Sequence, residues 1–208
     1  MQQLLRFLLS CVLLIERGRG CHLDPLLLDL PTEFYSERLF IRMPKPGDGN
    51  IVYEAISASI QELKPWMPFA YKGQTEEETE SNLREAQANF LLRKELRLLV
   101  FHKETGEFIA SSGLHHIDWR VPKFEIGYWI DKRHSGNGYI TEAVQRITEF
   151  AFEELQARRV EICCDERNKN SRAVAERLGF SLDCVLKNDA VSVDGKDLRN
   201  TCIYSKTS

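Results

Sequence analysis

The most constraining feature of this sequence is an apolar stretch, residues 124–130, that leads into the glycine-rich segment KRHSGNG at residues 132–138. From residue 139 onward, apolar residues recur at helical spacing, so the pattern predicts a strand, a tight turn and a long helix. Gly136 and Gly138 can take positive φ and allow a close approach of backbone to ligand. Because the first N–H groups of a helix lack partners within it and carry partial positive charge, two linked phosphates fit this turn.

Two common phosphate-binding patterns do not fit this segment. The pattern Gly-x-Gly-x-x-Gly fails because its third glycine would be Thr141, and the Gly-Lys-Ser/Thr of a Walker loop is absent. What is left, Arg-x-x-Gly-x-Gly at residues 133–138, resembles the pyrophosphate loop of the GNAT superfamily of acetyl-CoA-dependent N-acetyltransferases. By itself this hexapeptide is also compatible with an ordinary glycine-rich turn between a strand and a helix.

A second segment extends the resemblance. Residues 168–180, NKNSRAVAERLGF, are similar to the second GNAT signature, Asn-x-x-Ser followed by a short helix that ends in Leu-Gly-Phe. The order and spacing of both signatures resemble the branch that includes the ribosomal-protein serine and alanine N-terminal acetyltransferases (RimJ/RimL-like). The resemblance spans roughly residues 36–205. It implies a GNAT domain at residues 35–206, preceded by an extension at residues 1–34 that we expect to be poorly ordered.

The expected fold is a single α+β domain. The resemblance implies a mixed, mostly antiparallel central sheet with splayed strands, flanked by about four helices. Periodicity predicts helices at residues 49–63, 75–93, 139–156 and 171–178, and strands at residues 38–42, 97–102, 108–118, 124–130, 160–164, 181–186 and 199–204. Thr75 with Glu78 predicts a capping box. The spacing of Ile51, Ala55, Ile56 and Ile60 predicts the buried stripe of the first helix.

Composition excludes several other classes of protein. A chain of 208 residues suits one domain, and a net charge of −3 gives no sign of a nucleic-acid-binding surface. The six cysteines form no Cys-x-x-Cys pair or zinc spacing, so we expect no metal and a reducing cytoplasm. The apolar residues 4–15 are too short to span a membrane, and residues 16–20 offer no signal-peptidase site. We therefore interpret the N-terminus as an extension, or a start codon assigned too early, rather than a targeting segment.

The resemblance implies that acetyl-CoA is the co-substrate and that its acetyl group passes directly to a primary amine. Backbone N–H groups of the glycine turn would hold the phosphates, with a charge-assisted bond from Arg133. The backbone of residues 129–131 would pair with the pantetheine arm and offer an N–H to the developing oxyanion, while the side chains of Tyr128 and Trp129 could simply pack in the core. The expected cofactor-binding residues are Trp129, Ile130, Arg133, Ser135, Gly136, Asn137, Gly138, Tyr139, Asn168 and Ser171.

The catalytic candidates are Ser171, Glu125 and Asp189. The second-signature helix lacks the tyrosine that many GNAT members use near the leaving sulfur, and the ribosomal-protein branch has a serine at the position of Ser171. Both Asn168 and Ser171 could equally be helix caps alone. Glu125 could remove a proton through water, and Asp189 is nearest to where serine-acetylating relatives carry a glutamate. The rivals for the role of base are His115, His116, Asp118 and Asp189.

The amine acceptor is the least determined part of the sequence. Trp66 and Phe69, in the aromatic segment at residues 64–69, are predicted to bind the acceptor, although a purely structural role explains them equally. A protein N-terminal α-amine is the favoured acceptor; a small amine (a polyamine, amino acid or amino sugar) is the alternative, as is a non-catalytic acyl-CoA sensor. We expect a cytoplasmic monomer or homodimer with no nucleic-acid or membrane partner.

Overall fold

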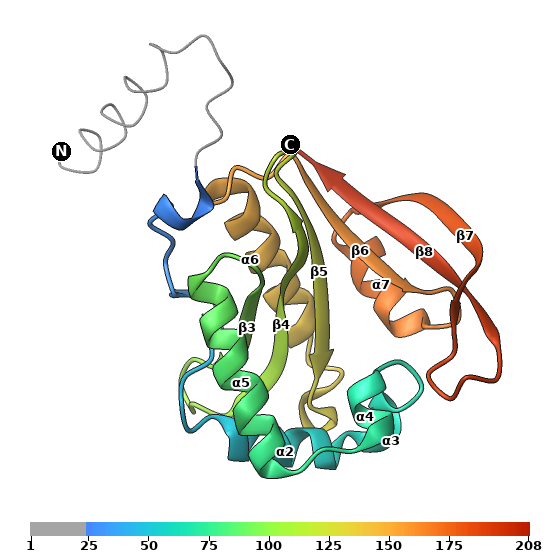
Figure 1. The fold of residues 1–208 in the computed structure, drawn as a ribbon, viewed down its shortest axis with the longest axis horizontal. Helices are drawn as coiled ribbons and strands as arrows, with labels where there is room; N and C mark the ends of the chain where they lie inside the picture. The colour runs from blue at the N-terminus through green and yellow to red at the C-terminus, as the bar shows by residue number, and fades with distance from the viewer. Residues whose placement is uncertain (1–23) are drawn as a thin grey trace, which may run out of the picture.

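The computed structural model describes residues 24–208, so most of the expected N-terminal extension lies outside the described part (Figure 1). The strands are β1 (Glu33–Tyr35), β2 (Leu39–Arg42), β3 (Leu96–His102), β4 (Phe108–Asp118), β5 (Lys123–Ile130), β6 (Arg159–Asp165), β7 (Ser181–Val191) and β8 (Leu198–Thr207). The helices are α2 (Gly49–Ala58), α3 (Ile60–Leu63), α4 (Pro68–Lys72), α5 (Glu76–Leu91), α6 (Tyr139–Glu153) and α7 (Lys169–Arg177), with short 3-10 turns η1 (Pro25–Leu27) and η2 (Lys132–His134).

All eight strands form one sheet in the order β1-β2-β3-β4-β5-β6-β8-β7. Every neighbouring pair is antiparallel except β5 and β6, which run parallel. The expected mixed, mostly antiparallel α+β fold is therefore confirmed, and β1 joins the sheet as a strand that the sequence did not predict.

The predicted helix at residues 49–63 is divided into α2 and α3 at the buried residue Ser59. The division lets the Ser59 hydroxyl accept a hydrogen bond from the backbone N–H of Lys132, 2.9 Å away, beside the glycine turn. In the predicted stripe, Ala55 and Ile56 are buried, but Ile51 is exposed and Val52 takes its place. With α4 starting at Pro68, the described residues contain six α-helices rather than about four.

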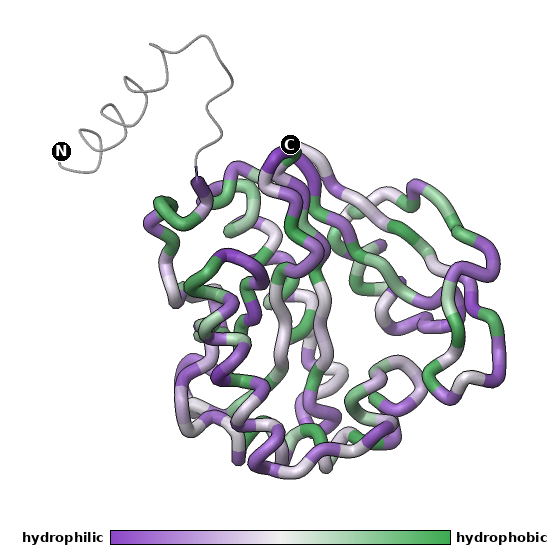
Figure 2. The backbone as a smooth tube through the Cα atoms, viewed as in Figure 1, coloured by the Kyte–Doolittle hydropathy of each residue, from purple (hydrophilic) through white to green (hydrophobic). Residues whose placement is uncertain are grey.

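The sheet separates two apolar layers. Leu98 and Val100 of β3 belong to the cluster that contains Ile147 of α6, whereas Leu99 and Phe101 point the other way, into the cluster formed with α2 and α5. This alternation follows from the two-residue period of a strand. Figure 2 shows the corresponding mixture of apolar and polar residues along the strands and helices.

The core includes residues N-terminal to the expected domain boundary. Leu30 and Phe34 are buried, and the Phe34 ring stacks on Phe150 of α6 at a centroid distance of 4.7 Å. The boundary expected between residues 34 and 35 falls inside β1, so the folded unit begins earlier than the sequence suggested. Only the part of the extension before residue 24 stays outside the structural description.

Strands β5 and β6 separate soon after they pair. Their register joins Lys123 to Arg159, Phe124 to Val160 and Glu125 to Glu161, and no later residues are paired. Beyond that point β6 continues alongside β8, and Figure 1 shows β5 and β6 diverging. The splayed strands implied by the resemblance are therefore present. The opening exposes strand edges whose N–H and C=O groups need partners.

Candidate active site

Two cavities meet at this opening. The split cavity, about 550 Å³, lies between β5 and β6 and is bordered by Ser135 of the glycine turn, the start of α7 and the β7–β8 hairpin. The face cavity, about 480 Å³, lies on the α2–α5 side of the sheet and is bordered by Arg97 and Ser111. The residues that line both cavities are Met67, His115, Gly127, Tyr128 and Trp129. Groups entering from the two cavities can therefore meet beside the middle of β5.

The glycine turn has the expected geometry. Gly136 and Gly138 have φ angles of 83° and 79°, in the left-handed region that favours glycine. Within the described chain, the backbone N–H groups of residues 136–141 have no acceptor, and no side chain caps α6. This run of free donors at a helix N-terminus provides a site for an anion that is built from backbone alone.

Arg133 of the turn has a partner within the protein. Its Nε lies 2.9 Å and its Nη2 2.5 Å from Oδ2 of Asp131, a residue with no exposed surface. This ion pair raises the pKa of Arg133 and neutralises the buried carboxylate. Arg133 therefore has a structural role in shaping the turn, and its direct bond to phosphate stays a prediction.

The turn is also attached to the N-terminal strands. Arg38 donates from Nε to Glu142 in the first turn of α6 (2.7 Å) and from Nη1 to the Asn137 carbonyl (3.2 Å). Its guanidinium lies 4.5 Å from the centre of the Tyr139 ring. Burial opposes ionisation of Glu142, but hydrogen bonds from Arg38 and Ser36 lower its pKa overall. Tyr139 thus faces Arg38 and does not line the split cavity.

The N-terminus of α7 brings Ser171 to a tyrosine from another element. The Asn168 side chain caps this helix by accepting from the Ser171 N–H (3.1 Å). The Tyr128 hydroxyl donates to the Ser171 carbonyl at 3.0 Å and lies 3.1 Å from its Oγ. Burial raises the pKa of Tyr128, and the bond to Ser171 offsets this only in part, so the phenol is protonated at neutral pH. The sequence interpretation missed Tyr128 because it treated this ring as core packing.

Glu125 lies in a cluster with two histidines. His115 is its neighbour in the β4–β5 register, with Nε2 3.2 Å from Oε1 of Glu125, and His116 Nδ1 lies 2.8 Å from Oε2. Adjacent residues of a regular strand point to opposite faces, but a bulge after His115 and a φ of 47° at His116 bring both rings to the same carboxylate. A Cβ on Gly127 would lie 2.7 Å from Cε1 of His115, so the glycine makes room for this ring.

The environment of Glu125 makes it a weak base. Burial opposes its ionisation, but hydrogen bonds and charge from His115 and His116 outweigh burial and lower its pKa to about 2. His115 lines both cavities, and the carboxylate can hold its ring. The donor atoms of His115, His116 and Glu125 lie within 4.8 Å of one another, close enough to hold a metal ion. The expectation that the protein binds no metal is therefore untested.

The other candidates occupy different places. Asp189 is exposed on β7 and lines neither cavity, and Asp118 forms an ion pair with Arg120 at 2.9 Å. Trp66 lines the split cavity, whereas Phe69 lines the face cavity and tilts against Trp129 at 6.3 Å. The two aromatic residues predicted to bind the acceptor therefore do not share one surface.

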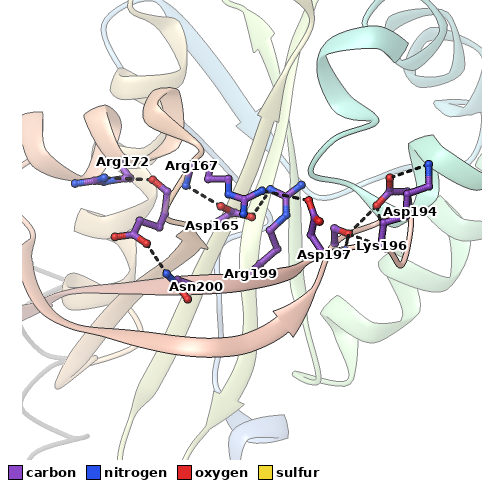
Figure 3. A network of polar contacts seen from close by, with 10 residues as sticks. Asp165, Arg167, Arg172, Asp194, Lys196, Asp197, Arg199 and Asn200 are labelled. Carbon is purple, nitrogen blue, oxygen red and sulfur yellow. Dashed lines mark hydrogen bonds and ion pairs between the residues drawn. The ribbon is translucent and has the colours of Figure 1, made fainter.

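A polar network fixes the far wall of the split cavity (Figure 3). Arg199 of β8 donates to Asp165 at the end of β6 (2.7 Å), and Asn200 donates to Glu166 (2.6 Å). At the hairpin turn, the Ser192 hydroxyl donates to an Asp194 carboxylate oxygen (2.6 Å). The bonds from Arg199 and Asn200 hold the β7–β8 hairpin beside β6, on the opposite side of the opening from β5, and the bond from Ser192 closes the hairpin turn.

Comparison with known families agrees with this geometry. The family model described as "Acetyltransferase (GNAT) domain" matches residues 38–181, more than half of the chain. The chain belongs to the GNAT acetyltransferase family. YdaF of Bacillus subtilis (strain 168), provisionally named a ribosomal N-acetyltransferase, is 37% identical over 70% of this chain and 79% of its own length. The ribosomal-protein-serine acetyltransferase of Escherichia coli (strain K12) is 31% identical over 66% of this chain and 74% of its own length.

Solved structures show the same fold. RimL, a ribosomal L7/L12 α-N-protein acetyltransferase in complex with coenzyme A, superposes with a TM-score of 0.77 at 20% identity, over 86% of this chain and 97% of its own. The microcin C7 self-immunity acetyltransferase MccE, in complex with acetyl-CoA and AMP, gives 0.77 at 22% identity, over 83% and 94%. This GNAT protein is an N-acetyltransferase, as the sequence predicted. No helix within residues 24–208 is long and apolar enough to cross a membrane.

Proposed function

We propose that this GNAT enzyme transfers the acetyl group of acetyl-CoA to the N-terminal α-amine of a protein, of the ribosomal-protein type. The observation that carries the proposal is the junction of the split and face cavities beside Gly127, Tyr128 and Trp129. A thioester in one cavity and an amine in the other would meet there. The names of YdaF and RimL support the choice of a ribosomal-protein acceptor.

The fit to acetyl-CoA rests on two sets of backbone donors. The free N–H groups of residues 136–141 suit the pyrophosphate. The N–H of Asp131 donates to Ile109 of β4, so by the alternation of antiparallel strands the N–H groups of Tyr128 and Ile130 point to the opening. These two groups would bind the amide-rich arm and the developing oxyanion. Acetyl-CoA supplies the activated acyl group; binding and proton transfer fall to the protein.

Proton removal from the amine is assigned to His115, with Glu125 as its positioning residue. An α-amine arrives largely as an ammonium and becomes nucleophilic when it loses a proton. The tautomer of His115 that donates Nε2–H to Glu125 leaves Nδ1 as an acceptor. Glu125, with its pKa of about 2, keeps the negative charge that orients the ring. Asp189 has no place in this mechanism, because it lines neither cavity.

Proton delivery to the leaving sulfur is assigned to Tyr128 and Ser171. Tyr128 carries its proton at neutral pH, and its hydroxyl lies within hydrogen-bond distance of Ser171 Oγ. The pair can pass a proton from the phenol through the serine hydroxyl to a thiolate in the split cavity. The phenol would thereby replace the tyrosine that the second-signature helix lacks.

A panel of acceptors tests the proposal. Purified enzyme with acetyl-CoA is offered peptides with free N-termini, the same peptides with blocked N-termini, polyamines, amino acids and amino sugars, and thiol release is measured. We expect turnover with the free peptides and none with the blocked ones. Turnover with small amines alone would overturn the protein-acceptor assignment and favour the small-amine alternative.

A further inference from the structure

Arg97 is a cation without a carboxylate partner inside the face cavity. Its Nε donates to the hydroxyl of Ser111 (3.2 Å), and neither Nη has an acceptor in the described part of the chain. Within residues 24–208 no carboxylate oxygen lies within the 4.0 Å of an ion pair with this guanidinium. Neither Nη is fully buried, and Arg97 lines the face cavity.

Two other enclosed arginines are paired with carboxylates. Arg42 holds Asp48 at 2.7 Å and Arg199 holds Asp165 at 2.7 Å, with all four side chains largely buried. Burial lowers the pKa of Arg97, and the carboxylate of Glu95 at the cavity rim opposes this only at longer range. Enclosing a guanidinium without a partner is costly. An anion from outside the chain would give Arg97 the kind of ion pair that Arg42 and Arg199 form within the protein.

A row of two glycines links Arg97 to the cavity junction. Arg97 is registered with Gly113 of β4, and Gly113 with Gly127 of β5. A Cβ on Gly113 would lie 2.5 Å from the Leu96 carbonyl, so only glycine fits there. Because neither glycine has a side chain, an extended chain could cross the sheet above Gly113 and bring its amine to the His115 ring, which lies above Gly127.

The distances along this row suit a short peptide. Neighbouring strands lie about 4.8 Å apart, so the Cα of Arg97 lies about 10 Å from that of Gly127. The bond of Arg97 to Ser111, the register neighbour of Trp129, brings the guanidinium closer to the junction. An extended peptide advances about 3.3 Å per residue. An amine at the junction therefore places the side chain of the second or third residue near Arg97.

We propose that Arg97 determines acceptor specificity by binding a carboxylate on the second or third residue of the peptide whose α-amine is acetylated. This inference rests on the proposed function and names its substrate class: protein N-termini with an acidic residue next to, or one removed from, the first residue. The planar guanidinium, with both Nη groups free, matches the two oxygens of a carboxylate.

The test compares peptides that differ only by aspartate or asparagine at position two or three. Wild-type enzyme should prefer the acidic member in kcat/KM by about tenfold or more, the usual scale for a charge-assisted bond. Arg97→Gln should lower kcat/KM for the acidic peptide and bring the ratio close to one. Arg84→Gln, an exposed arginine of α5 outside both cavities, is the matched control and should keep the wild-type ratio.

The outcomes separate this inference from the proposed function. Efficient acetylation of both peptides with a wild-type ratio near one overturns the role of Arg97 and leaves the protein-acceptor assignment intact. A preference that persists in Arg97→Gln overturns it as well. Acetylation of free amino acids but of no peptide overturns the proposed function. Should Arg97→Gln be too unstable to assay, the ratio of the wild-type kcat/KM values for the two peptides is the test. A ratio of about ten or more supports the inference, and a ratio near one overturns it.

Discussion

The Tyr128 hydroxyl donates a hydrogen bond of 3.0 Å to the carbonyl of Ser171, and its oxygen lies 3.1 Å from the serine hydroxyl. The two residues are 43 positions apart in the sequence and come from β5 and α7. Their contact spans the opening where the sheet divides. It places a protonated phenol and a serine hydroxyl together on the wall of the split cavity.

Tyr128→Phe should reduce kcat strongly and change acetyl-CoA affinity little. The substitution removes a proton donor that acts mainly in the transition state and keeps the ring that packs in the core. Ser171→Ala should have the same pattern of effects. Steady-state kinetics and calorimetric titration with acetyl-CoA check this. If Ser171 only caps α7, its variant will instead lose about 1 kcal/mol of stability with normal kcat.

Acetyl-CoA should protect the enzyme against thermal unfolding, by about 2.7 kcal/mol at a concentration one hundred times its dissociation constant. Gly136→Glu should abolish this protection, because it brings a carboxylate to the predicted phosphate site. Gly136→Asn is the matched control, since asparagine tolerates positive φ and adds no charge. Melting curves with and without acetyl-CoA measure the effect, and full protection of the glutamate variant would argue against the loop assignment.

Glu125 should stabilise the fold in a pH-dependent way. Its pKa is lowered in the folded state to about 2 from an ordinary 4.5, so its stabilising effect is fully present above pH 4.5 and disappears as the pH falls toward 2. The difference in melting temperature between wild type and Glu125→Gln should therefore shrink over that range. A difference that stays constant between pH 5 and pH 2 would contradict the ion-pair account of this cluster.

Gly127→Ala should impair the proposed base. A Cβ there would lie 2.7 Å from Cε1 of His115, so the imidazole must move away from its place above β5. We expect a lower kcat with acetyl-CoA affinity retained, and His115→Gln should give a similar loss. If kcat in both variants equals that of wild type, another group or water removes the proton.

Removal of residues 1–23 should leave an active enzyme, whereas removal through Leu28 should destabilise it. The second deletion takes away the Leu28 carbonyl that accepts a 2.8 Å bond from Arg93, together with η1. Circular dichroism melts and acetyl transfer by both truncated proteins measure this. Equal stability of the two would show that the segment after residue 23 contributes little.

The sequence predicted those parts of the fold that depend on local pattern. The capping box of Thr75 and Glu78 is present, and the glycines of the turn have positive φ. The strand at residues 108–118 matches β4 at both ends. In each case residues close in the chain carry the physical cause.

The features that were missed depend on residues far apart in the sequence. Tyr128 meets Ser171 only because β5 and β6 separate, and Glu142 is bound by Arg38, 104 positions away. The bulge that turns His116 toward Glu125 has no signature in the residue types. The predicted stripe was wrong at Ile51, because Val52, the next residue of α2, faces the core instead.

The central claim is acetyl transfer to a protein α-amine at the junction of the two cavities. The most direct test is tandem mass spectrometry of a peptide that carries both a free N-terminus and an internal lysine, after incubation with enzyme and acetyl-CoA. The account predicts a single acetyl group on the N-terminal nitrogen, and its loss in Tyr128→Phe and His115→Gln. Acetylation of the lysine alone, or no acetylation of any peptide by a folded enzyme that binds acetyl-CoA, would contradict it.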